Sequence, residues 1–418
     1  MEKVIVVAIK YPNIPSIELN NSLQELSRLI NTAGGEVVET VIQKRDKPDP
    51  SFLIGSGKAT EIANIAKKYN IRAVVFNNEL TFTQQRNLEE VIDAKIIDRT
   101  RLILDIFAYR ARTKEGILQV ELAQLNYYLP RLTKRGIMFD NQVGGIGARG
   151  PGERKLEYDR RKIRDRIAVL NREINKIQNF RTLQRQKRIS KNIPIVSLIG
   201  YTNAGKSTLL NTLTKCSPER MVYADDKLFA TLDPTIRRLK LPSGRFILIS
   251  DTVGFIRNLP HQLIAAFRAT LEEIKESDCL IHVIDVTSNE RKLQESVVMQ
   301  TLNEIGVKNI PIINVYNKCD LFNYKNIPNE QYIKISARTG YGIENLLKQI
   351  DKTIEYKKLY RELNLSYNDI SLIDIIHKYA NVVEKLYTDS YLKLRLQIDN
   401  INWNILKKKL KEQNYEYR

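Results

Sequence analysis

The chain has 418 residues, enough for two to four domains with sizeable hydrophobic cores. It carries 67 Lys and Arg against 48 Asp and Glu, and the resulting net charge of +19 favours a polyanionic partner. Its three cysteines and three histidines lack ligand spacing, which argues against disulfides and a zinc site. The sequence has no run of 18 apolar residues and no signal-peptide pattern, so we expect a cytoplasmic protein without a membrane span.

Residues 1–110 alternate apolar strand-like runs with amphipathic helical segments, which predicts a small N-terminal α/β domain. The expected strands are 4–9, 37–42, 73–76 and 95–98, and the expected helices are 22–31, 59–69 and 83–92. Gly55-Ser56-Gly57-Lys58 looks like a phosphate loop but has the wrong spacing, so we interpret it as a turn that opens a helix.

Residues 111–191 contain two helical segments whose apolar residues recur at alternating spacings of four and three. The first seam is Leu118, Leu122, Leu125, Leu129 and Leu132, and the second is Ile163, Ile167, Leu170, Ile174 and Ile177. Two such stripes can bury each other, which predicts a long antiparallel helical hairpin. Pro130 is expected to break or kink the first helix near its end.

The predicted hairpin is strongly basic. Residues 131–191 hold 18 Lys and Arg against six Asp and Glu, a surplus of 12 (18 minus 6). A glycine-rich tip at 144–152 is flanked by Arg135, Arg149, Arg154 and Lys155. Because cations release counterions from phosphates and glycine allows close backbone approach, we predict contact with RNA through shape and backbone. A solvated helical face with an inert connector is the alternative.

Residues 192–355 open with the most specific motif of the chain, Gly200-Tyr201-Thr202-Asn203-Ala204-Gly205-Lys206-Ser207-Thr208. It fits G-x-x-x-x-G-K-[ST] between an apolar run at 195–199 and a helical run at 209–213. The two glycines let backbone N–H groups face an anion. Lys206 is expected to reach the β- and γ-phosphates and Ser207 to bind Mg²⁺.

Three further motifs follow in the order of a guanine-nucleotide switch. Asp251-Thr252-Val253-Gly254 can hold the Mg²⁺ shell and place the Gly254 N–H on the γ-phosphate. In Asn317-Lys318-Cys319-Asp320, Asp320 can accept the guanine N1–H and N2–H₂ donors, which adenine does not offer, while Lys318 covers the purine face. Ser336-Ala337-Arg338 can supply a backbone N–H to guanine O6. Together they predict a P-loop GTPase domain with a doubly wound, mostly parallel sheet.

The segment at 228–235 is expected to carry the first switch. Thr231 would complete the Mg²⁺ shell and contact the γ-phosphate, with Phe229 and Ala230 beside the nucleotide, and Thr235 is the alternative threonine. We therefore assign Lys206, Thr231 and Gly254 as catalytic and Ser207, Thr231 and Asp251 as Mg²⁺ ligands. The helix at 261–276 is the expected second switch element.

Two residues bear on the rate of hydrolysis. Phe255 follows Gly254 where several switch GTPases have a Gln that orients the attacking water, so slow intrinsic hydrolysis and stimulation by a partner are expected. Asn203 either helps to hold K⁺ beside the phosphates, as in some related GTPases, or only forms a turn.

Residues 356–418, with an alternating strand at 392–396 and a Lys-rich helix at 405–411, predict a small α/β or α+β domain.

Over nearly its whole length the chain resembles the HflX family of translational GTPases, within the Obg–HflX group. The most specific stretches are 200–208, 228–235, 251–257 and 144–155. The resemblance implies a ribosome-associated GTPase that binds the 50S subunit and, with GTP, separates stalled or idle 70S ribosomes, its N-terminal domain and hairpin reaching rRNA near the peptidyl-transferase centre. It also implies adenine-nucleotide binding, which the Asp320 argument does not explain, and it is weakest in the C-terminal region. A role in large-subunit assembly is the alternative, an RNA-binding protein with a vestigial nucleotide site is a third hypothesis, and a monomer is expected.

Overall fold

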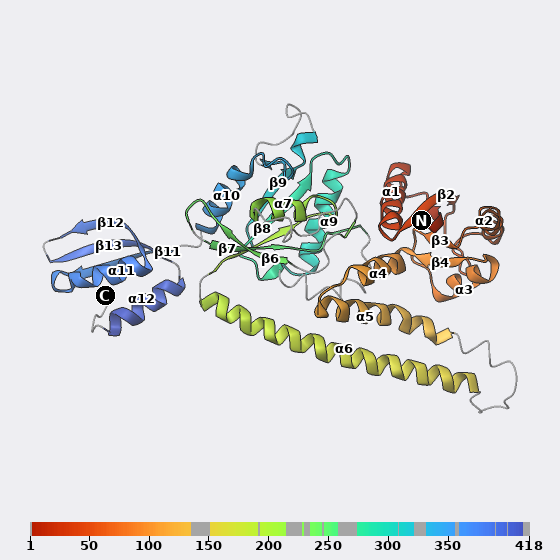
Figure 1. Cartoon of the computed structure of the whole chain (residues 1–418), viewed down its shortest axis with the longest axis horizontal. Helices are drawn as coiled ribbons and strands as arrows, with labels where there is room; N and C mark the ends of the chain where they lie inside the picture. The colour runs from red at the N-terminus through yellow and green to blue at the C-terminus, as the bar shows by residue number, and fades with distance from the viewer. Residues whose placement is uncertain are drawn as a thin grey trace.

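The computed structural model of the chain describes residues 2–134, 151–190, 193–214, 228–229, 235–244, 246–257, 274–307, 309–321, 332–355, 359–388, 390–398 and 400–412. Three sheets and a long helical hairpin make up this part of the molecule, and the largest sheet lies between the two smaller ones (Figure 1). Among the described residues, no helix combines the length and apolar character needed to cross a bilayer.

The N-terminal sheet has four parallel strands in the order β2-β1-β3-β4, with two helices on each face. Its elements are β1 (Glu2–Lys10), α1 (Ser16–Thr32), β2 (Gly35–Lys44), α2 (Ser56–Lys68), β3 (Ala73–Phe76), α3 (Phe82–Val91), β4 (Lys95–Asp98) and α4 (Arg99–Arg110). Helices α1 and α4 share one apolar cluster, whereas α2 and α3 share another on the opposite face.

The expected elements of this domain form, with some differences in length. Helix α1 begins at Ser16 rather than Ser22, because Leu19 packs into the core and extends the buried face by one turn. Strand β2 is longer than expected because it pairs with β1 from Gly35 to Lys44, and its exposed outer residues lack the apolar pattern that marks a buried strand. Gly55 is the residue before α2, so the glycine-containing stretch opens a helix as expected.

The predicted helical hairpin is present and is formed by α5 (Lys114–Tyr128) and α6 (Pro151–Ser190) (Figure 1). Leu118, Leu170 and Ile174 are the buried centre of its seam. Helix α5 ends at Tyr128 and continues as a 3₁₀ turn, Leu129–Lys134, because Pro130 cannot continue an α-helix. Since α6 begins at Pro151, the predicted tip overlaps its first two residues.

Part of the predicted RNA contact lies outside what can be described. Arg135, Arg149 and positions 144–150 of the tip fall outside the described residues, while Arg154 and Lys155 lie in α6 with side chains that are not described. Where the side chains of α6 are described, its exposed cations are Arg161, Lys162, Arg164, Arg166, Arg172 and Lys176, of which Arg166 is paired with Glu121 of α5 at 2.6 Å.

The central sheet has six strands in the order β10-β9-β8-β5-β7-β6, and only the edge strand β6 runs antiparallel to its neighbour. Its elements are β5 (Ile195–Ile199), α7 (Lys206–Thr214), β6 (Thr235–Lys240), β7 (Phe246–Asp251), β8 (Cys279–Asp285), α9 (Arg291–Glu304), β9 (Ile312–Asn317), η4 (Cys319–Leu321), β10 (Ile333–Lys334) and α10 (Ile343–Glu355). The reversal of strand order on either side of β5 places the loop after β5 at the position where such sheets bind ligands. The predicted mostly parallel α/β fold is confirmed.

The C-terminal domain is an antiparallel sheet in the order β11-β13-β12 packed against two helices. Its elements are β11 (Leu359–Ser366), η6 (Tyr367–Leu372), α11 (Ile373–Tyr379), β12 (Asn381–Tyr387), β13 (Tyr391–Ile398) and α12 (Asn400–Glu412). Of the two classes expected from the sequence, the antiparallel pairing selects α+β.

Candidate nucleotide-binding site

The phosphate loop connects the central strand β5 to α7, and two of its positions require glycine. Gly200 has a φ of 149°, and a Cβ there would lie 2.3 Å from the carbonyl oxygen of Val283 in β8. Gly205 has a φ of 92°, and a Cβ there would lie 2.3 Å from Nδ2 of Asn317 in β9. A loop packed this tightly can curl its backbone N–H groups toward a bound anion.

The side chain of Asn317 joins three of the sequence motifs. Its Nδ2 donates to the carbonyl oxygen of Ala204 at 2.9 Å, and its Oδ1 accepts from the backbone N–H of Ala337 at 2.9 Å. Asn317 is buried and therefore acts as a crosslink between the phosphate loop and the 336–338 loop. Its own contact with nucleotide stays a prediction.

Lys206 lies inside the phosphate loop. Its ammonium group donates to the carbonyl oxygens of Gly200 at 3.1 Å and Tyr201 at 2.8 Å. Burial lowers the pKa of Lys206 to about 8, and the negative charge of Asp251 partly opposes this effect. Because burial disfavours the ammonium, a phosphate bound beside it would stabilise the charged form and raise its pKa again.

Two oxygen groups assigned to Mg²⁺ lie next to each other. The hydroxyl of Ser207 donates to Oδ2 of Asp251 at 2.6 Å. The parallel pairing of β5 with β7 sets Leu198 beside Asp251, which brings the end of β7 level with the phosphate loop. A hydroxyl and a carboxylate are ligands that a hard cation such as Mg²⁺ prefers, so the residues present fit the ion.

The segment around Gly254 is held against the phosphate loop. The backbone N–H of Thr202 donates to the carbonyl of Phe255 at 2.8 Å, and the Phe255 N–H donates to the carbonyl of Gly200 at 3.1 Å. A Cβ on Gly254 would lie 2.8 Å from Cα of Thr202. The side chain of Phe255 is buried, so this position offers an apolar ring packed in the core.

The groups assigned to the guanine base lie at the ends of β9 and β10. Asp320 is exposed in η4, whereas Lys318 is half-buried with a left-handed φ of 65°. Ser336 is buried and its hydroxyl accepts from the N–H of Thr339, which closes the turn that contains Arg338. The ammonium of Lys318 lies 2.7 Å from Asp285, a residue that the sequence reasoning missed. The sequence signal that could have identified Asp285 is that it is a carboxylate at the end of β8, the strand that pairs with β9.

Some assigned residues direct their side chains elsewhere. The hydroxyl of Thr252 donates to the carbonyl of Leu198 at 2.6 Å, and Val253 is buried. The ring of Phe229 packs edge-on against Phe107 of α4 with centroids 4.6 Å apart, so any nucleotide contact would fall to its backbone. Ala230 and Thr231 lie outside the described residues, as does the second switch helix up to residue 273. Thr235, the alternative switch threonine, is the first residue of β6.

Sequence reasoning also missed a polar junction between α1, α4 and the phosphate loop. The hydroxyl of Tyr201 donates to Glu25 of α1 and accepts from the N–H of Arg257 at 2.9 Å. Glu25 also binds Arg99 at 2.5 Å, and the Arg257 guanidinium lies 2.9 Å from Glu18. Burial, reinforced by the charge of Glu25, raises the pKa of Tyr201, which therefore stays a donor. The N-terminal domain thus contacts the loop that binds phosphate.

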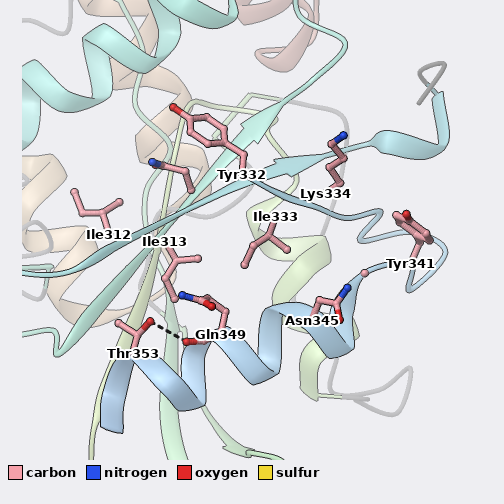
Figure 2. A pocket seen from close by; sticks show the side chains of 11 residues that line it. Ile312, Ile313, Tyr332, Ile333, Lys334, Tyr341, Asn345, Gln349 and Thr353 are labelled. Carbon is pink, nitrogen blue, oxygen red and sulfur yellow. Dashed lines mark hydrogen bonds between the residues drawn. The ribbon is translucent and has the colours of Figure 1, made fainter. Parts of the chain in front are cut away.

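Two cavities near the central sheet differ in their relation to this site. One of about 260 Å³ lies beside Tyr201, Thr202 and Asn203 and is closed by α1 and the residues after β8. A larger groove of about 810 Å³ lies between β9, β10 and α10, where Tyr332, Tyr341 and Gln349 surround it (Figure 2). Its described lining contains none of the residues assigned to nucleotide, so it is separate from the nucleotide site.

Comparison with known proteins agrees with this arrangement. Three family models match in succession: "GTP-binding GTPase N-terminal" at residues 20–108, "GTP-binding GTPase Middle Region" at 110–188 and "50S ribosome-binding GTPase" at 195–318. The chain is 45% identical to "GTPase HflX" of Caldanaerobacter subterraneus subsp. tengcongensis over 95% of this chain and 91% of that protein. It is 39% identical to "GTPase HflX" of Escherichia coli over 97% and 95% of the two chains.

Among solved structures, a GTP-binding protein from Sulfolobus solfataricus in complex with GDP is 26% identical to this chain. The match covers 85% of this chain and 99% of that one, with a TM-score of 0.44.

Proposed function

The chain belongs to the HflX family of GTPases, and from that premise we propose that this GTP-hydrolysing protein binds the large ribosomal subunit and separates 70S ribosomes in a nucleotide-dependent manner. The observation that carries the proposal is the contact between the nucleotide loops and the N-terminal domain. Phe229 of the first switch segment packs on Phe107, and Arg257, three residues after Gly254, binds Glu18. Movement of either segment therefore acts on the domain that precedes the basic hairpin.

In the proposed site, the residues of the chain divide the work of phosphoryl transfer to water. Lys206 binds the β- and γ-phosphates, and Ser207 and Asp251 hold Mg²⁺, which supplies positive charge to the developing phosphate oxygens. The Gly254 N–H contacts the γ-phosphate, with Thr231 as the proposed switch threonine. The 2.6 Å contact between Ser207 and Asp251 and the position of Gly254 against Thr202 support these roles.

We propose that hydrolysis is slow in the free protein and is stimulated by the ribosome. The buried ring of Phe255 offers no hydrogen bond to an attacking water, so another group must order that water. Asn203 lies in the phosphate loop with a left-handed φ of 61° and is the candidate partner of a K⁺ ion. Equal rates of GTP turnover in K⁺ and in Na⁺ would remove K⁺ from the mechanism.

Ribosome binding is proposed to run through the hairpin. The exposed cations of α6 form a basic surface, and binding through phosphates weakens steeply as salt rises because counterions are released. Affinity for the 50S subunit should therefore fall with salt. A charge-reversing variant such as Arg164→Glu should weaken it, while Tyr109→Phe at an exposed position of α4 should not.

Co-sedimentation and light scattering together test the proposal. The protein is mixed with 50S subunits or 70S ribosomes and GDP, GTP or a non-hydrolysable GTP analogue. We expect binding with the two triphosphates and loss of the 70S scattering signal, with Lys206→Ala as the inactive control. If the protein binds with the triphosphates but 70S ribosomes stay intact with every nucleotide tested, the alternative role in large-subunit assembly is favoured. Binding that is the same with every nucleotide would contradict both roles.

A further inference from the structure

An ion pair links two of the strands that end at the guanine side of the site. Nζ of Lys318 lies 2.7 Å from Oδ2 of Asp285, and both side chains are largely withdrawn from solvent, with 25% and 17% of their surface exposed. The other oxygen of Asp285, Oδ1, accepts from the backbone N–H of Thr287 at 2.9 Å and from its hydroxyl at 2.6 Å. Each carboxylate oxygen therefore has its own partner, and the group is held in one orientation.

The sheet places this pair. Strands β8 and β9 run parallel in a register that sets Asp285 beside Asn317, and the N–H of Val286 donates to the carbonyl of Asn317 at 3.1 Å. The Asn317 side chain is held by Ala204 and Ala337, and the next residue, Lys318, has a left-handed φ of 65°. The side chain of Lys318 therefore begins just after the C-terminal end of β9, beside Asp285, the carboxylate that ends the neighbouring strand β8.

We propose that Asp285 is a positioning residue for the purine base, holding the Lys318 ammonium so that its aliphatic stem lies ready along the base. The inference rests on the proposed assignment of Lys318 and Asp320 to the base. A free lysine side chain samples many rotamers, and ordering it on binding opposes affinity. A carboxylate that fixes the ammonium beforehand removes much of that loss.

The roles of Asp285 and Asp320 are then distinct. Asp320 reads the donors on guanine, so it sets the preference for guanine over adenine nucleotides. The Lys318 stem covers a purine face that guanine and adenine share. Loss of Asp285 should therefore weaken binding of both nucleotide classes by the same factor and leave their ratio unchanged.

The test is a double-mutant cycle on the dissociation constants of GDP and ADP. Asp285→Asn keeps an oxygen acceptor for Thr287 but removes the charge that faces Lys318. We expect GDP affinity to fall about three- to tenfold, with ADP affinity changing by the same factor. In a Lys318→Ala background the same substitution should have no further effect, because its route to the base is gone. In Asp285→Asn alone, the rate of hydrolysis at saturating GTP should equal that of the wild type, because only nucleotide affinity is affected.

Thr287→Val is the matched control, since it loses the hydroxyl contact with Asp285 but not the ion pair. Its GDP affinity should stay within about twofold of the wild-type value. Wild-type affinity in Asp285→Asn, or equal losses in both Lys318 backgrounds, would overturn the proposal. If Lys318→Ala binds GDP like the wild type, the fault lies in the assignment of Lys318 to the base, which is a separate failure.

Discussion

Tyr201 and Glu25 join the phosphate loop to the first helix of the N-terminal domain. The tyrosine hydroxyl donates to the Glu25 carboxylate and also accepts the N–H of Arg257 at 2.9 Å. One side chain therefore connects the loop that holds phosphate, the segment that follows Gly254, and α1.

Removing the hydroxyl in Tyr201→Phe should loosen the junction. The buried N–H of Arg257 loses its acceptor, at a cost of about 1–3 kcal/mol. We expect faster amide hydrogen exchange at Arg257 and along α1. The control is Tyr109→Phe, because Tyr109 is 84% exposed on α4. Unchanged exchange in Tyr201→Phe would show that the junction does not depend on the hydroxyl.

Removing the ring in Phe229→Ala should destabilise the docking of the first switch segment. Phe229 is 2% exposed and packs on Phe107, and truncation of a buried Phe costs about 3–5 kcal/mol. A lower urea midpoint with faster proteolysis near residues 228–229 is expected. Phe180→Ala, at a position that is 60% exposed on α6, should leave the midpoint within experimental error. Equal effects of the two substitutions would contradict the packing argument.

Adding a methyl group in Gly254→Ala should slow hydrolysis. The new Cβ would lie 2.8 Å from two Thr202 atoms and 3.1 Å from the Lys206 ammonium, so the segment must move away from the phosphate loop. If the Gly254 N–H contacts the γ-phosphate as proposed, misplacement on this scale should lower the single-turnover rate by roughly ten- to a hundredfold. Affinity for GDP, which lacks the γ-phosphate, should change little. Gly57→Ala, where no atom lies within 4 Å of the new Cβ, is the control.

The lowered pKa of Lys206 predicts a pH dependence of GTP binding. The pKa of Lys206 is about 8, against an ordinary value of 10.5. A phosphate bound beside the ammonium would raise this pKa again. Affinity should therefore fall as pH rises through about 8, with net proton uptake on binding measurable by calorimetry in buffers of different ionisation enthalpy. In Lys206→Met this uptake should disappear, and persistence would assign it to another group.

The lowered pKa of Lys206 affects folding stability in the opposite direction to GTP affinity, because stability rises with pH whereas affinity falls. Between about pH 8 and 10.5 the unfolded chain holds the Lys206 proton and the folded chain does not. Stability conferred by this group therefore rises with pH across that window, and the effect should be absent in Lys206→Met.

Local sequence determined the elements and much of the site. Apolar runs followed by glycine located β5 and the phosphate loop, and the four-and-three spacing of Leu118 with its neighbours predicted the hairpin seam, because periodicity depends only on residues near in sequence. The roles predicted for Lys206, Ser207 and Asp251 also rest on residue type and order. The structure then confirms that Ser207 and Asp251 are neighbours.

Only the tertiary structure decided which distant residues meet. Asn317 crosslinks two loops, and the ring of Phe229 packs against Phe107 of the N-terminal domain. Asp285 lies beside Lys318 because of the register between β8 and β9. Glu25, Arg99 and Arg257 come together although they are far apart in the chain. A hydrogen bond or ring contact depends on distances of a few ångströms in space, and the packing of whole elements sets those distances. The spacing of the residues along the chain does not contain that information.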